Sequence, residues 1–214
     1  MRKKIRVIIS SLIIFALVFV FGFPAFAQSK TGSFMSEWGK TLRGYAIDEK
    51  GGEEQEIYAK GNSATITEEE IQQATDFYIL SGMNKDAARE KAIAYVKERE
   101  ALYEEAIRNG YSVTEDEIWN YLEELKEVIN NADNKEDAYE VMNSFGSEQE
   151  YWNYEFGVYQ KNLPIQKYVD SLQAQYVAKS GQARGTLDFM NDFNSYYKEY
   201  KQSLVEAENY KLVE

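Results

Sequence analysis

The sequence predicts a mainly α-helical protein, with several helices arranged around one long central helix. Ser or Thr followed three residues later by Glu is typical of a capping box, in which a hydroxyl and a carboxylate reciprocally satisfy free backbone amides at a helix start. Apolar residues recur at steps of three and four after each such motif, and only 2 of the 214 residues are proline. The three motifs are Thr67 to Glu70, Thr114 to Glu117 and Ser147 to Glu150.

The first 27 residues have the three parts of a secretory signal peptide. Four cations within residues 2–6 precede an apolar run over residues 7–23, and Ala25-Phe26-Ala27 provides a cleavage site of small residues. We expect residues 1–27 to direct export and to be removed after Ala27, so that the mature protein is secreted or associated with the cell envelope. The alternative is an uncleaved leader that anchors the protein, and contact with a membrane is expected only in that case.

The rest of the chain is strongly acidic. Without the four leader cations, 20 Lys and Arg (24 − 4) stand against 36 Asp and Glu, which gives a net charge of −16 (20 − 36). Such a charge repels phosphate backbones, so nucleic acid is not an expected partner. The absence of His and Cys excludes nucleophilic dyads, histidine acid–base catalysis and the usual zinc sites. We therefore expect no enzyme activity, no cofactor and no metal.

Residues 28–56 form an N-terminal extension of the mature chain, in which the sequence indicates one element, a hairpin. Tyr45-Ala46-Ile47 and Ile57-Tyr58-Ala59 flank Lys50-Gly51-Gly52, a pattern that fits a small β-hairpin. The first predicted helix covers residues 68–80 with Ile71, Ala74 and Tyr78 facing inward, and it ends at Ser81-Gly82.

The central helix is predicted from Asn84 to Arg108, on the order of 35 Å long at 1.5 Å per residue. Asn109-Gly110 provides its C-cap. Arg99 falls inside the apolar stripe of this helix. Either its stem packs while its head pairs with a carboxylate, or it makes a positive contact inside a groove.

Four more helical segments follow. Residues 115–129 have the clearest amphipathic pattern, with Trp119 off the apolar face, and a short helix is expected over about 135–145. The helix over 148–163 is apolar on two sides, and Pro164 kinks or restarts it before it continues toward Lys179. After a linker at 179–186, a terminal helix over 187–208 and a short strand within 210–213 complete the chain. The terminal helix is expected to bury Phe189, Phe193, Tyr196, Tyr200, Leu204 and Ala207.

The aromatic side chains provide more apolar surface area than a single interface between helices can bury. Trp119 lies off its helix face, while Tyr151, Tyr154 and Val158 form the second apolar side of the helix over 148–163. Exposed aromatic patches often mark binding surfaces, because Tyr and Trp offer a large contact area at low entropy cost. These four residues, together with Arg99, are the candidate peptide-binding residues.

Two stretches, together with the run Thr65-Ile66-Thr67-Glu68-Glu69-Glu70-Ile71, resemble the N-terminal chaperone domain of the SurA/PrsA class of extracytoplasmic foldases. One runs from Arg99 through Asn109-Gly110-Tyr111-Ser112-Val113-Thr114 to Ile118, where a long helix stops at glycine and a new helix starts at a capping box. The other is Gly146-Ser147-Glu148-Gln149-Glu150-Tyr151-Trp152. The resemblance covers residues 57–178, and it implies that the terminal segment, 187–214, folds back to complete that domain.

The chain departs from this class in two ways. A parvulin-type prolyl isomerase domain usually stands where this chain has only the linker at 179–186, so the resemblance implies no isomerase activity. Lipid anchoring through cysteine is also impossible here, because the chain has no cysteine.

The function expected from these observations is an exported, ATP-independent holdase that binds unfolded or newly translocated polypeptides. The alternative is an envelope adaptor that uses the same helices to hold one folded partner or to form a homodimer.

Overall fold

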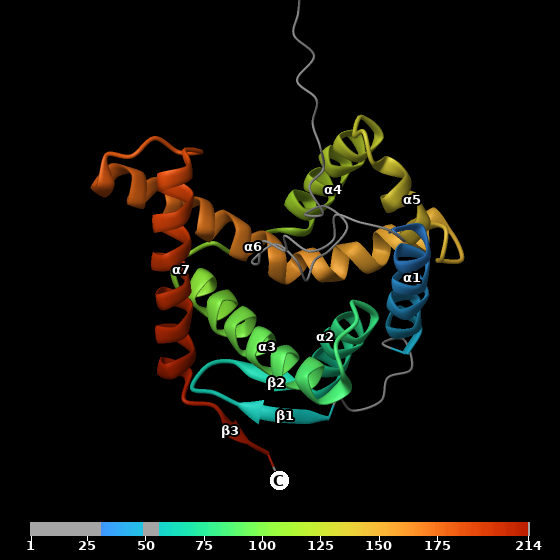
Figure 1. The fold of residues 1–214 in the computed structure, drawn as a ribbon, viewed down its shortest axis with the longest axis horizontal. Coiled ribbons are helices and arrows are strands. Elements are labelled where there is room, and N and C mark those ends of the chain that lie inside the picture. The colour runs from blue at the N-terminus through green and yellow to red at the C-terminus, as the bar shows by residue number, and fades with distance from the viewer. Residues whose placement is uncertain (1–30, 49–55, 214) are drawn as a thin grey trace, which may run out of the picture.

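The computed structural model describes residues 31–48 and 56–213, and it is mainly helical, as predicted (Figure 1). The predicted signal peptide, 1–27, lies outside the described residues, as do residues 28–30 and 49–55 of the segment 28–56. In chain order, the helices and strands of the described part are α1 (Thr31–Asp48), β1 (Ile57–Lys60), β2 (Thr65–Thr67), α2 (Glu68–Leu80), α3 (Lys85–Arg108), α4 (Glu115–Asn130), α5 (Lys135–Met142), α6 (Glu148–Ser180), α7 (Leu187–Glu208) and β3 (Lys211–Leu212).

Local capping chemistry sets where α2, α3 and α4 begin. Thr67 and Thr114 each form a complete capping box, with the glutamate three residues later, as predicted. Asn84 caps α3, and Gly110 follows that helix with a positive φ of 84°, which glycine adopts readily. The predicted bounds of α2 and α3 agree with the structure.

The third motif forms only half of a capping box. The Ser147 hydroxyl accepts a hydrogen bond from the backbone N–H of Glu150, as expected. The carboxylate of Glu150, however, accepts from the backbone N–H of Gly146 and from Nε of Arg43, which lies on α1. The reciprocal half of the prediction is wrong because a cation from a distant helix competes for the carboxylate.

The predicted pairing of residues 45–47 with residues 57–59 is also wrong. Residues 45–47 belong to α1, where Trp38, Leu42 and Ala46 are buried at four-residue spacing. A hairpin does form, but β1 pairs with β2 and, on its other side, with β3, all antiparallel. The helical stripe of α1 outweighs the short alternation of Tyr45, Ala46 and Ile47.

The described helices enclose two hydrophobic cores. The larger core lies among α1, α2, α4, α5 and the first halves of α3 and α6. The smaller core joins α3, the second half of α6, and α7. Its fully enclosed members are Leu102, Ala106, Ile165, Tyr168, Leu172, Phe189, Phe193 and Tyr197.

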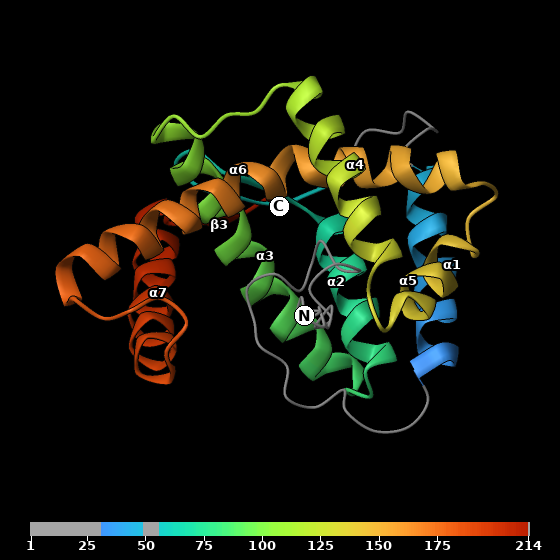
Figure 2. The same ribbon diagram turned by 90° about the horizontal axis from the view of Figure 1, so that it is seen from above.

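Helix α6 stays one helix through the buried Pro164, and its second half reaches away from the larger core (Figure 2). Together with the beginning of α7, this half of α6 forms an arm at one side of the molecule (Figures 1 and 2). The predicted strand at the end of the chain is present as β3, and it pairs with β1. The terminal segment therefore packs back onto its own chain.

The buried face of α7 differs from the predicted one. Phe189 and Phe193 are buried as predicted, but Tyr197 and Lys201 follow them in place of Tyr196 and Tyr200. Figure 1 shows α7 crossing α3 at a large angle. An oblique crossing can follow the ridge formed by every fourth residue, which Phe189, Phe193, Tyr197 and Lys201 form.

The end of α7 closes over the turn between β1 and β2. The Glu208 carboxylate accepts hydrogen bonds from the backbone N–H groups of Ser63, at 2.8 Å, and Ala64, at 3.0 Å. It also accepts from the Ser63 hydroxyl. These bonds tie the last turn of α7 to the sheet.

Substitution of Gly61 by alanine should loosen this attachment. A Cβ atom at position 61 would lie 2.4 Å from Oε2 of Glu208 and 3.0 Å from Cε1 of Tyr210. We expect the free energy of unfolding, measured by urea denaturation, to fall by about 1 to 3 kcal/mol. Gly157→Ala is the matched control, since no atom lies within 4 Å of that position in α6, and it should be neutral or slightly stabilising. Equal stability of the two variants would contradict the role of Glu208.

Candidate functional site

Four charged side chains meet where α2, α3 and α6 come together. Arg99 Nη2 lies 2.6 Å from Oε1 of Glu70 and 2.7 Å from Oε1 of Glu100. Lys161 Nζ lies 2.8 Å from a carboxylate oxygen of each of the same two glutamates. We call these four residues the charge cluster. Of the two arrangements considered for Arg99, the structure shows the one in which its head pairs with carboxylates.

Ion pairing within the charge cluster favours the charged forms of Glu70 and Lys161. Burial raises the pKa of Glu70, but the positive charges of Arg99 and Lys161 outweigh it and hold that pKa below its usual range. Burial lowers the pKa of Lys161, yet Glu100 and Glu70 outweigh that effect and raise it. Ion pairs that link three helices and favour the charged forms of Glu70 and Lys161 suit a structural contact between helices better than an acid–base pair.

The predicted contact residues on α6 and α4 are largely used in internal packing. Only 1% of Tyr151 is exposed, and its ring packs edge-on against Phe145 and Trp152. Tyr154 is half-buried, and its hydroxyl accepts a 2.6 Å hydrogen bond from Gln73 of α2. Tyr151 is therefore unavailable to a client in this structure.

Trp119 and Val158 are half-buried as well. The indole of Trp119 stacks on Phe156 with ring centroids 4.8 Å apart and planes 24° apart. Helix α6 has two apolar sides because α4 covers one side, through Trp119 and Tyr121, while α2 and the segment after α5 cover the other. The structure does not gather the five predicted residues on one open surface.

Glu155 is a buried acid that the sequence analysis did not identify. It lies on α6 with 2% of its surface exposed, four residues after Tyr151, with which it shares a hydrogen bond. Burial raises the pKa of Glu155 to about 8, although the hydrogen bond with Tyr151 opposes the shift. The signal in the sequence was a single carboxylate within the second apolar side of α6.

The interface between α3 and α7 contains a buried cation. Lys201 is 2% exposed, and its Nζ lies 2.6 Å from Oε2 of Glu98 and 5.2 Å from the ring centroid of Tyr197. Burial lowers the pKa of Lys201, and Glu98 only partly offsets that effect. The hydroxyl of Tyr197 is buried without a hydrogen-bond partner. The sequence analysis missed this interface because it placed Tyr197 and Lys201 off the buried face.

Exposed apolar side chains are found at the beginning of α7, on the arm. Leu187 is 78% exposed, Met190 49% and Tyr196 37%. Tyr196 packs against the ring of Tyr176 on α6, with centroids 5.4 Å apart. We call Leu187, Met190 and Tyr196 the arm tip.

Two further findings concern the whole described part of the chain. None of the helices within 31–48 and 56–213 is both long enough and apolar enough to cross a membrane. Across the same residues, no three acidic side chains converge in a way that could hold a metal ion.

Comparison with known proteins gives no match: no family model, no curated protein and no solved structure is similar to this chain. The resemblance to the SurA/PrsA class therefore rests on the sequence motifs alone.

Replacement of Arg99 by methionine should destabilise the fold. Glu70 and Glu100 would then share Lys161 alone, and removing one member of a buried charge network typically costs about 3 to 5 kcal/mol. Arg184→Met is the control, because Arg184 pairs with Asp170 at the surface and such pairs contribute less than about 1 kcal/mol. Urea denaturation at pH 7 measures both, and comparable small losses would contradict the structural role of the cluster.

The charge cluster should also make the stability of the protein depend on pH. A carboxylate whose pKa is lowered by folding stabilises the protein above its unfolded pKa, 4.5 for Glu70, and this contribution is lost as the pH falls through the folded pKa. The loss of stability below pH 4.5 should therefore be shallower in Arg99→Met than in the wild type.

Glu155→Gln should act in the opposite pH range. Folding raises the pKa of Glu155 from 4.5 to about 8. The contribution of Glu155 to the free energy of unfolding is therefore most favourable below pH 4.5, and it declines as the pH rises to 8. The amide cannot ionise, so the variant should be more stable than the wild type by roughly 2 to 4 kcal/mol at pH 8, and by much less at pH 5. Glu124→Gln, at an exposed position on α4, should show no such difference. A pH-independent difference for Glu155→Gln would contradict the assignment.

Proposed function

We propose that this chain is an exported, ATP-independent holdase that binds unfolded secreted polypeptides and has no prolyl isomerase activity. The observation that carries the proposal is the arm tip, where Leu187, Met190 and Tyr196 present apolar surface to solvent. Apolar side chains that are exposed close together often mark a binding surface. Since Trp119 and Tyr151 are used in internal packing, the client contact belongs on the arm.

Three features of the sequence support the same function. The leader predicts export, which brings the protein together with newly translocated chains. The helix-stop and capping motifs resemble those of the SurA/PrsA chaperone domain. The net charge of −16 after cleavage (20 − 36) favours basic clients and opposes aggregation of the loaded complex.

The proposal can be tested with denatured lysozyme, a basic secreted protein. The purified protein should suppress light scattering when denatured, reduced lysozyme is diluted into buffer at an equimolar ratio. Leu187→Ser together with Met190→Ser should weaken this protection at least threefold, because both side chains lose their apolar contact area. Asn191→Ser with Asn194→Ser, at exposed positions of the same helix, should leave it unchanged. If the wild type neither protects nor binds unfolded lysozyme, the proposed function is wrong.

The second candidate is an envelope adaptor or a homodimer that uses the same helices. The small size of the arm tip favours it, since three apolar side chains fit a single complementary site better than many different clients. Analytical ultracentrifugation distinguishes the holdase from the adaptor or homodimer. A stable dimer that loses its self-association in the Leu187→Ser, Met190→Ser variant would support the adaptor over the holdase.

A further inference from the structure

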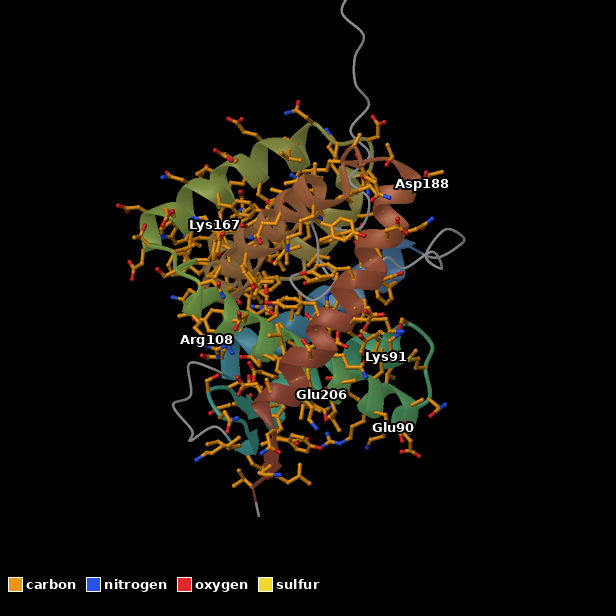
Figure 3. All side chains as sticks on the ribbon, turned by 90° about the vertical axis from the view of Figure 1, so that its left-hand side faces the viewer. Glu90, Lys91, Arg108, Lys167, Asp188 and Glu206 are labelled. Atoms are coloured by element: carbon orange, nitrogen blue, oxygen red, sulfur yellow. The ribbon has the colours of Figure 1, made fainter. Side chains whose placement is uncertain are left out.

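Helix α7 packs across α3 and the second half of α6, and it covers an apolar surface formed by these two helices. Figure 3 shows this helix in the foreground, running from near Asp188 to Glu206 over the rest of the chain. Its inner face packs on a surface formed by Leu102 and Ala106 of α3 and by Tyr168 and Leu172 of α6. We call these four residues the receiving face.

The inner face of α7 shows what chemistry the receiving face accepts. Phe189, Phe193 and Tyr197 follow one another at four-residue spacing, and their rings stack with centroids 5.6 Å and 5.7 Å apart. Lys201 continues the series and brings its ammonium group to Glu98, which stands beside the receiving face on α3. The surface therefore accommodates a helix with three aromatic side chains in a row, followed by a cation.

The contact between α7 and α3 includes groups that water would solvate better. Among the described residues the buried hydroxyl of Tyr197 has no hydrogen-bond partner, which is less favourable than a hydroxyl in water. The ammonium of Lys201 is almost fully removed from water. Both groups regain hydration when α7 leaves, which lowers the free energy needed to open this interface.

Short non-helical connections join both ends of α7 to the chain, and the hydrogen bonds from Ser63 and Ala64 to Glu208 must break before the helix can leave. Residues 181–186 connect it to α6, with Gly181 and Gly185 both at positive φ. At the other end, Asn209 is at φ 51° and leads to β3, which pairs with β1 through two residues. Neither end continues as a helix into a neighbouring element.

We propose that the receiving face is the principal peptide-binding surface, and that α7 occupies it until an amphipathic client helix with aromatic residues at four-residue spacing and a following cation takes its place. This inference rests on the proposed holdase function and specifies its client class. The arm tip, which is part of α7 itself, is where a client first contacts the protein. Displacement of α7 then exposes the aromatic and aliphatic surface that the client covers.

A disulfide that holds β3 to β1 tests the inference in the full chain. Lys60 and Lys211 are opposite each other in the antiparallel pair and both are exposed. Opposite residues in such pairs have Cα atoms about 4.5 to 5.5 Å apart, which suits a disulfide. Because the chain has no cysteine, Lys60→Cys with Lys211→Cys introduces the only two thiols. The oxidised variant joins the end of α7 that leads into β3 covalently to the sheet, whereas in the reduced variant only hydrogen bonds, including those to Glu208, hold that end.

The matched control shares one of these substitutions. Lys60 is also opposite Thr65 in the pair formed by β1 and β2, and both side chains are exposed. Lys60→Cys with Thr65→Cys therefore forms a disulfide in the same sheet without restraining α7.

Two probes report on binding. One is a fluorescein-labelled synthetic peptide of residues 187–213, and the other is lysozyme that has been reduced and alkylated with iodoacetamide, which stays unfolded and has no thiols. Oxidation of the Lys60→Cys, Lys211→Cys variant should weaken binding of both probes at least tenfold, and dithiothreitol should restore it. The control variant should bind equally well in both redox states. A peptide with Phe193→Ala and Tyr197→Ala should bind at least tenfold more weakly than the original peptide.

The outcomes separate the inference from the function on which it rests. Equal binding of lysozyme by the oxidised and reduced variants would overturn the inference while the holdase function stands. Absence of lysozyme binding in every form, with peptide binding that disappears on oxidation, would support exchange of α7 and contradict the holdase function. Absence of peptide binding to the reduced variant would overturn the inference as well.

Discussion

The charge cluster of Glu70, Arg99, Glu100 and Lys161 fixes the arrangement on which the rest of the structure depends. It joins the start of α2, the middle of α3 and the middle of α6 by four short ion pairs. Separating the partners of a buried ion pair leaves uncompensated charges, which costs several kcal/mol. The cluster thereby sets the register of α6 on α3. That register determines which side chains of the two helices form the receiving face under α7.

The elements that the sequence predicted well are those whose ends depend on neighbouring residues. Thr67, Asn84 and Thr114 define helix starts through hydrogen bonds that span three residues, so the chain itself carries the information. The mainly helical fold class followed from the same motifs. Export and the chaperone class were predicted from the leader and from motif resemblance, and they enter the functional argument as proposals.

The features that the sequence did not reveal depend on contacts between distant residues. Residues 45–47 are helical because Trp38, Leu42 and Ala46 pack on the larger core, which a three-residue alternation cannot show. Tyr151 is buried because α6 has neighbours on both sides. Helix α6 therefore carries more aromatic residues than one interface can bury, but two interfaces bury them in the folded protein. The pairing of Glu98 with Lys201 joins residues 103 apart along the chain. Its position follows from the angle at which α7 crosses α3, which no local pattern encodes.

These corrections relocate the expected binding surface from α6 and α4 to α7 and the surface beneath it. The larger core leaves little aromatic area available, whereas the arm combines exposed apolar side chains with an interface that buries a cation and an unpaired hydroxyl. Helices that must open for function usually belong to the least stable part of a fold. We propose that helix α7 belongs to this part, since a non-helical linker precedes it and a two-residue strand follows it, with the Glu208 hydrogen bonds as its further attachment to the sheet.

Amide hydrogen exchange measured with and without unfolded client tests the displacement of α7 most directly. The account predicts that amides of residues 187–208 exchange faster than those of residues 98–106 in the free protein, and faster still when alkylated lysozyme is present in saturating amounts. Over residues 98–106, exchange should slow or stay unchanged because the client covers the receiving face. If α7 is as protected as α3 and its exchange does not respond to bound client, the account is contradicted.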